Sequence, residues 1–152
     1  MILEYFSLPH CEHKPIRANP SDAGLDLCYN PVDGAQCVLE PGQSTILATG
    51  LKFGVPHGYM IQIMNRSGNA AKRSLMVGAC VVDSGYNGEV FVNLHNMGTM
   101  EQTINPGDKI AQAVVIPVVP ARFLETQSDN LYEWSAITIS DRGAGALGST
   151  GR

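Results

Sequence analysis

The segment Val90–His95 reads VFVNLH, and the segment Tyr59–Met64 reads YMIQIM. In both segments apolar side chains tend to alternate with polar ones. Successive side chains of a β-strand point to opposite faces of a sheet, so this alternation predicts strands that have one buried face. The two segments therefore favour a β fold.

Similar short runs, separated by glycine and proline, recur along the rest of the chain. The 152 residues include 16 glycines and 9 prolines, and turn material such as Asn105-Pro106-Gly107 divides the runs. This spacing is typical of antiparallel β proteins and predicts a single all-β domain. The other predicted strands are Ile2–Ser7, Leu25–Tyr29, Gln36–Leu39, Gln43–Leu47, Leu51–Val55, Thr103–Ile104, Lys109–Pro117 and Arg122–Leu124.

Only one segment favours a helix. Ser67–Arg73 (SGNAAKR) begins with a serine, which we expect to cap the helix. At the other end of the chain, the glycine-rich segment Ser140–Arg152 has one large apolar residue, Leu147, and cannot pack a core by itself. We therefore expect a β domain at residues 1–139 and a mobile arm at residues 140–152. The arm is either a frayed terminus or a lid whose backbone amides close over an anion.

Composition excludes several classes of function. A length of 152 residues with 44% hydrophobic and 16% charged residues is typical of one soluble globular domain. The net charge is −4 and the basic residues are scattered, so we expect no nucleic-acid partner. No window approaches 18 apolar residues, and Met1–Ser7 lacks a basic leader, so we expect neither a membrane span nor a signal peptide.

Four cysteines occur at spacings that match neither a C-x-x-C pair nor a zinc finger, and they favour a reduced, cytoplasmic setting. The densest cluster of possible metal ligands is His10-Cys11-Glu12-His13. Alternation along a strand could direct two of these side chains at one metal ion, but a solvated loop before Pro15 is the favoured interpretation, because no second cluster completes four ligands.

Five segments, in this order and at this spacing, resemble the five motifs of the trimeric deoxyuridine triphosphate nucleotidohydrolases (dUTPases). The resemblance spans nearly the whole chain. The segments are Asp22–Leu27 (DAGLDL), Asn65–Ala70 (NRSGNA), Val81–Glu89 (VVDSGYNGE), Gly107–Gln112 (GDKIAQ) and Arg142–Gly151 (RGAGALGSTG).

The resemblance implies a distorted jelly-roll β-barrel, a homotrimer, and active sites shared between subunits. It also implies hydrolysis of dUTP to dUMP and pyrophosphate with Mg²⁺, which keeps uracil out of DNA and supplies dUMP for thymidylate synthesis. The expected location is the cytoplasm, or the host cytoplasm for a virus-encoded protein.

The third motif is similar to the family's catalytic and nucleoside-binding segment. By this resemblance Asp83 orients and deprotonates the water that attacks the α-phosphorus. Tyr86 lies under the deoxyribose and leaves no space for a 2′-hydroxyl. A β-hairpin from Val81 to Phe91 offers its backbone groups to uracil. The substrate-binding residues expected here are Cys80, Val81, Val82, Tyr86 and Phe91.

The other motifs imply contacts with phosphate and metal. Asp26 is the expected acceptor of a Mg²⁺-bound water, and the alternative is a buried carboxylate paired with an arginine. Gln112 is expected to reach the phosphates from a neighbouring subunit. Arg66, Ser67 and Gly68 are expected around phosphate, and Arg142, Ser149 and Thr150 over the γ-phosphate. Gly148 is expected to allow close approach of the backbone, and Leu147 is expected to lie over uracil.

Five positions depart from the family pattern. Asn65 and Asn69 stand where proline and leucine are usual, which leaves the rigidity of their loop open. Gly85 replaces an aspartate and is expected to loosen the hairpin. Cys80 replaces a glycine and adds a thiol near the nucleotide, and Leu147 replaces the phenylalanine that covers uracil.

Two alternative functions remain open. One is a dCTP deaminase, which shares the fold but uses a glutamate base where this chain has Asp83. The other is a non-catalytic trimeric signalling protein that uses the nucleotide site as a switch. The product distinguishes the three functions. A dUTPase releases pyrophosphate, a dCTP deaminase releases ammonia, and a non-catalytic protein releases neither.

Overall fold

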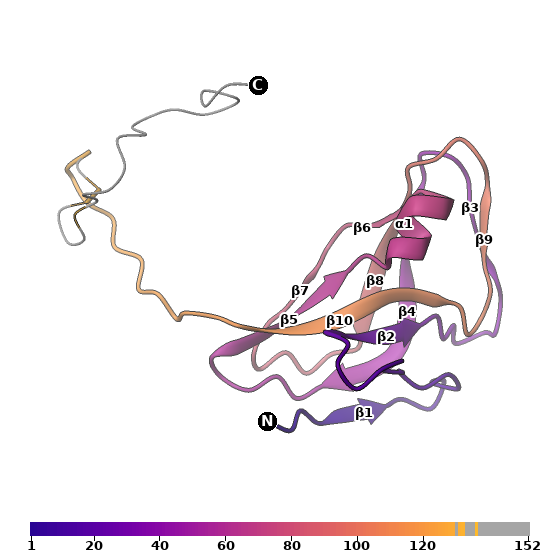
Figure 1. The fold of residues 1–152 in the computed structure, drawn as a ribbon, viewed down its shortest axis with the longest axis horizontal. Helices are drawn as coiled ribbons and strands as arrows, with labels where there is room; N and C mark the ends of the chain where they lie inside the picture. The colour runs from indigo at the N-terminus through magenta and orange to yellow at the C-terminus, as the bar shows by residue number, and fades with distance from the viewer. Residues whose placement is uncertain (130, 133–135, 137–152) are drawn as a thin grey trace. The chain divides into compact units, whose positions relative to one another are not determined.

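The computed structural model describes residues 1–129, 131–132 and 136. Met1–Pro120 form one compact unit, and Ala121–Arg152 form a second. The regular elements of the described residues all lie in the first unit (Figure 1). They are β1 (Tyr5–Ser7), β2 (Gly24–Cys28), β3 (Cys37–Leu39), β4 (Ser44–Phe53), β5 (Tyr59–Met64), α1 (Ser67–Arg73), β6 (Leu75–Val77), β7 (Val81–Val82), β8 (Val90–Asn96), β9 (Gln102–Ile104) and β10 (Lys109–Pro117).

The strands form two four-stranded sheets and a two-stranded sheet. One sheet has the order β1-β4-β8-β6, the second has the order β2-β10-β5-β7, and β3 pairs with β9. All of these pairs are antiparallel. Because strands close in sequence often belong to different sheets, the chain crosses repeatedly between them, and the predicted all-β jelly-roll fold is confirmed (Figure 1).

Both large sheets contribute to one hydrophobic core. Leu51 and Leu94 of the first sheet and Leu27 and Ile61 of the second are each at most 1% exposed and belong to the same cluster. In β8 the buried residues alternate with residues of higher exposure, as the sequence predicts. Burial of this alternating face is what holds the strands in register, because a slip by one residue would turn the apolar side chains to solvent.

The sequence-predicted bounds are confirmed for β5, β10 and α1. By contrast, β4 is one continuous strand where the sequence predicts two. The predicted gap contains a β-bulge, a register shift between Ala48 and Leu51 against β8. Gly50 takes a φ of 68° there and Thr49 is fully buried, so the bulge bends the strand without ending it.

Two short strands are missing from the list of predicted strands, and two further predictions about strands are wrong. The short strands β6 and β7 are missing from the prediction because pairing with neighbours, rather than a long apolar run, stabilises them. The residues 122–124 form no strand, and Phe123 is 95% exposed. The segment 81–91 is not a hairpin, because β7 pairs with β5 in one sheet whereas β8 pairs with β4 and β6 in the other.

The start of α1 also differs from the prediction. Arg66 occupies the N-cap position, and no side-chain hydrogen bond caps the helix, so Ser67 is the first helical residue rather than the cap. At the other end, Arg73 donates to Gln102 Oε1 and to the Thr103 carbonyl of β9, which lies beside α1 in Figure 1. No helix in the described part of the chain has the length and apolar character needed to cross a membrane.

Candidate active site

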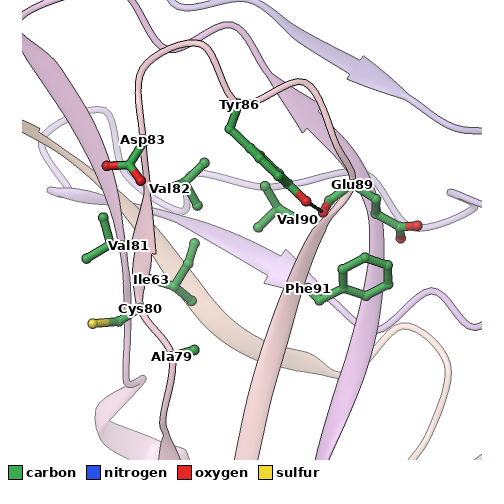
Figure 2. Close-up of a pocket in the computed structure, with 10 residues that line it drawn as sticks. All are labelled: Ile63, Ala79, Cys80, Val81, Val82, Asp83, Tyr86, Glu89, Val90 and Phe91. Atoms are coloured by element: carbon green, nitrogen blue, oxygen red, sulfur yellow. Dashed lines mark hydrogen bonds between the residues drawn. The ribbon is translucent and has the colours of Figure 1, made fainter.

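A pocket of about 400 Å³ lies where the two large sheets separate between β7 and β8. It brings together six of the predicted site residues, as Figure 2 shows. These are Cys80, Val81, Val82, Asp83, Tyr86 and Phe91. Ile63, Ala79, Glu89 and Val90 complete the lining and are not among the predicted site residues.

Backbone edges face this pocket on both sides. Within the described residues, β7 pairs on one edge only, with Ile61 and Gln62 of β5. The β6 partner of β8 covers Leu94–Asn96 but not Val90 or Phe91. A strand edge without a partner presents N–H and C=O groups that can pair with a ligand. The pocket can therefore form backbone hydrogen bonds with the polar edge of a planar ring.

Asp83 begins the connection between β7 and β8. Its side chain is exposed, and its carbonyl accepts a hydrogen bond from the Tyr86 backbone N–H at 3.2 Å, which closes a turn. Gly85 takes a φ of 84° in this turn, a conformation that glycine adopts without strain. The glycine that was expected to loosen this segment therefore suits the turn that presents Asp83.

Tyr86 folds back over the same connection. Its hydroxyl donates to the Glu89 carbonyl at 2.9 Å, the bond drawn in Figure 2. The ring lies so close to Gly88 that a Cβ at that position would collide with the Tyr86 hydroxyl and ring carbons. The ring is thus held at the wall of the pocket by the bond from its hydroxyl to Glu89 and by its packing against Gly88.

A second group of predicted residues lies outside this pocket, around Asp26. The Asp26 carboxylate accepts from Arg66 Nε at 2.8 Å and forms an ion pair with Lys109 Nζ at 2.9 Å. Burial alone would raise the pKa of Asp26, but the hydrogen bonds and positive charges of Lys109 and Arg66 outweigh it and hold the pKa below its ordinary value. Two cations against one carboxylate leave a net positive charge, which suits an anionic ligand.

The pairing of Asp26 with Arg66 matches the alternative considered from the sequence, a structural carboxylate paired with an arginine. Lys109 is the member that sequence reasoning missed. The sequence places Lys109 and Asp26 in predicted strands. It does not show that these strands pair, because the pairing of β2 with β10 joins segments that are distant in the sequence.

Gln112 also belongs to this second group. Its Nε2 donates to the Asn65 carbonyl at 2.9 Å, and its side chain packs so closely over Gly24 that a Cβ there would collide with it. Asn65 in turn accepts from the Val77 backbone N–H at 2.6 Å. Asn69 donates to the Lys109 carbonyl at 2.9 Å. The two asparagines that depart from the family pattern therefore tie their loop to β6 and β10.

Ser67 and Gly68, at the first turn of α1, are exposed and line no part of the Asp83 pocket. The predicted residues Arg142, Leu147, Gly148, Ser149 and Thr150 lie outside the described residues.

In the described part of the chain, no group of three or more His, Cys, Asp or Glu side chains could hold a metal ion. Within the segment 10–13, His10 binds Glu89, Cys11 is buried, and the His13 ring packs against Gly107. All four cysteines are free, and burial raises the pKa of the Cys28 and Cys37 thiols.

Comparison with known proteins adds an independent result. The family model described as dUTPase matches residues 12–151. The chain is 38% identical, over 95% of its own length and 92% of the other protein, to the deoxyuridine 5′-triphosphate nucleotidohydrolase of Gloeobacter violaceus. It is 40% identical to the enzyme of the same name from Desulfotalea psychrophila, over 85% of this chain and 81% of that protein.

Solved structures show the same fold. A mutant dUTPase of Staphylococcus bacteriophage 80alpha, with dUpNHpp, superposes on this chain with a TM-score of 0.84. The match covers 99% of this chain and 99% of that one, at 23% sequence identity. A mutant dUTPase from phage phi11 of S. aureus, described as coordinating a structural Mg(II) ion, superposes with a TM-score of 0.75 at 23% identity and covers 86% of this chain and 99% of that one.

Proposed function

Because the chain belongs to the dUTPase family, we propose that it is a dUTP diphosphatase that hydrolyses dUTP to dUMP and pyrophosphate. The observation that carries the proposal is the match of the family model across residues 12–151, which includes every residue of the Asp83 pocket. The activity keeps uracil out of DNA and supplies dUMP. Four free cysteines are compatible with a cytoplasmic setting.

Asp83 is the proposed general base. Its carboxylate accepts a proton from a water molecule, and the water oxygen attacks the α-phosphorus as the bond to the leaving pyrophosphate breaks. The position of Asp83 supports this role, because the turn formed with Tyr86 and Gly85 presents an exposed carboxylate at the edge of a pocket. Such a base typically accelerates a reaction about 10²–10⁴-fold.

The same pocket binds the nucleoside. The unpaired edges beside Val81 and Phe91 are suited to pair with uracil, whereas cytosine presents a donor in place of an acceptor. Tyr86 lies against the deoxyribose and excludes a 2′-hydroxyl. Cys80 and Val82 line the wall of the pocket.

The Asp26 group binds the triphosphate. Arg66 supplies a guanidinium, Ser67 and Gly68 supply a hydroxyl and backbone N–H groups, and Gln112 supplies an amide. Charge supports this assignment, since Arg66 and Lys109 together exceed the single charge of Asp26.

Mg²⁺ is the proposed cofactor, and it would neutralise charge on the triphosphate when bound. The residues fit an indirect site only. Both Asp26 oxygens already meet cations but retain lone pairs that can accept from a metal-bound water, and the described residues lack a cluster able to bind the ion directly. Mg²⁺ commonly keeps several waters and takes its direct ligands from substrate phosphates.

We further propose a homotrimer in which each site is shared between chains. Arg66, Ser67, Gly68 and Gln112 do not line the Asp83 pocket of their own chain, which supports a site to which a neighbouring chain contributes them. Arg142, Leu147, Gly148, Ser149 and Thr150 would complete the site when the residues 140–152 close over the nucleotide.

The test is a product assay across the deoxynucleoside triphosphates with Mg²⁺ in ¹⁸O-water. The expected result is pyrophosphate from dUTP, with the label in dUMP. Release of ammonia from dCTP would identify a deaminase, and binding of dUTP without any product would identify a non-catalytic protein. Label found only in pyrophosphate would place the attack on the β-phosphorus and contradict the mechanism.

A further inference from the structure

Glu89 is fixed by segments that are distant in the sequence. Its Oε1 accepts from the Gly50 backbone N–H at 2.7 Å and from His10 Nε2 at 3.1 Å, and its side chain is 14% exposed. Next to it, the buried Thr49 hydroxyl donates to the Val90 carbonyl. The start of β8 is therefore anchored to the β4 bulge and to the segment that follows β1.

This anchor is continuous with the nucleoside pocket. The Glu89 carbonyl holds the Tyr86 hydroxyl at 2.9 Å, and Gly88 leaves the space into which the ring folds. Figure 2 shows the ring meeting the Glu89 backbone, whereas the Glu89 carboxylate extends away from Asp83. The carboxylate is therefore directed at Gly50 and His10 rather than at Asp83.

We infer that Glu89 is a positioning residue for Tyr86 and, through that ring, sets the preference of the pocket for deoxyribose over ribose. The inference rests on the proposed function, in which Tyr86 lies against the sugar. Without the Glu89 carboxylate, the Gly50 N–H and His10 lose their acceptor. The Glu89 carbonyl then keeps only the anchor that the Thr49–Val90 bond gives to the next residue, and it holds the ring less firmly. A displaced ring leaves space for a 2′-hydroxyl.

The inference predicts coupling between two substitutions. Glu89→Ala and Tyr86→Phe should each lower the ratio of kcat/KM for dUTP to that for UTP by about two- to tenfold, the usual worth of one hydrogen bond. The double variant should fall no further than Tyr86→Phe alone, because both changes remove the same link. Glu89→Gln keeps an oxygen acceptor and should restore most of the ratio. Glu40→Ala, an exposed glutamate away from the pocket, is the matched control.

A measurement independent of activity tests the positioning itself. In the wild type, the Tyr86 ring protons and the Gly88 Hα protons should give a nuclear Overhauser contact, because the ring packs against Gly88. The contact should weaken in Glu89→Ala and persist in Glu89→Gln.

The outcomes separate this inference from the proposed function. A wild type that does not hydrolyse dUTP contradicts the proposed function. The nuclear Overhauser contact between Tyr86 and Gly88 then still tests whether Glu89 positions the ring. A ring contact that persists in Glu89→Ala overturns the inference. So does a ratio that is unchanged in Glu89→Ala, or a double variant whose loss is the product of the two single losses.

Discussion

Asp83 lies in an exposed turn with no hydrogen bond from its side chain to another described residue, so a change to its charge should affect chemistry far more than folding. We expect Asp83→Asn to bind a non-hydrolysable dUTP analogue and to lose about 10²–10⁴-fold in kcat. Steady-state kinetics and calorimetric titration measure the two effects. Asp33→Asn, in a loop outside the pocket, is the matched control. Turnover near the wild-type rate would remove Asp83 from its proposed role.

Asp26 should make stability depend on pH. Its pKa is lowered in the folded protein, so the unfolded chain binds its proton first as the pH falls. The stabilisation is therefore complete above the unfolded pKa near 4 and is lost as the pH drops through the lower folded value. We expect Asp26→Asn to lower the free energy of unfolding by about 1–3 kcal/mol at pH 7.

Denaturant unfolding of both proteins from pH 7 to pH 2.5 or so tests this, with the difference between them narrowing only below about pH 4. A difference that stays constant over that range would show that the Asp26 charge contributes nothing. Arg66 and Lys109 are both about one-third exposed, which favours the lower end of the expected loss.

Side chains at the site divide into those that sequence could predict and those that it could not. Asp83 and Tyr86 belong to one short motif, so their proximity follows from the chain itself. The roles of Glu89 and Lys109 depend on partners brought together by folding. Glu89 meets His10, which lies 79 positions away, and Lys109 of β10 meets Asp26 of β2. A linear pattern carries no information on such pairs without the sheet topology.

Among the elements, the β7–β8 connection contributes Asp83, Tyr86 and Glu89 to the lining of the pocket. Gly85 has a φ of 84° and open space around its Cα, so an added methyl group would meet backbone strain but no collision. We expect Gly85→Ala to cost about 1–2 kcal/mol of local strain and to raise KM for dUTP.

Gly85→Asn should have a smaller effect, because asparagine tolerates this conformation better. Gly54→Ala is the control, since a Cβ there would make an ordinary contact at 3.6 Å. Equal KM values for Gly85→Ala and Gly54→Ala would show that the turn does not shape the pocket.

Element prediction succeeded where one local signal was strong. β5 and β10 have runs rich in apolar and β-branched residues, and α1 has two consecutive alanines; these signals operate within a few residues. β6 and β7 are three and two residues long and exist because β8 and β5 supply hydrogen-bonding partners. The supposed hairpin failed for the same reason, since the two sides of the segment 81–91 find better partners in different sheets.

The segment 140–152 gives a prediction at the scale of an element. A chain that ends before Ser140 should keep its fold, because the removed segment has one large apolar residue, Leu147. Its kcat/KM should fall by orders of magnitude, because the shortened chain lacks Arg142, Ser149 and Thr150, which we propose cover the γ-phosphate and exclude water. Circular dichroism checks that the fold is retained, and steady-state kinetics measure the loss of kcat/KM. Full activity would identify the segment as a frayed terminus.

At the scale of the whole molecule, the Asp26 group does not line the Asp83 pocket of its own chain, which favours the proposal that each site is shared between chains. Closed symmetric assembly places a group of one chain beside the pocket of the next. We expect light scattering to give about three times the chain mass of 16.3 kDa. A monomer at working concentration that hydrolyses dUTP would contradict shared sites.

Mixed trimers give the sharpest test of that sharing. The Asp83→Asn chain retains the segment 140–152, and a chain that ends before Arg142 retains Asp83. We therefore expect each to be inactive alone, for a different reason. If a site takes Asp83 and Arg142 from different chains, random exchange at equal concentrations makes about one quarter of the sites complete. We expect activity to appear on mixing after a brief dissociation, in proportion to subunit exchange measured by native mass spectrometry. Exchange without recovered activity would mean that each pocket uses the Arg142 of its own chain, because then no combination of these two variants yields a complete site.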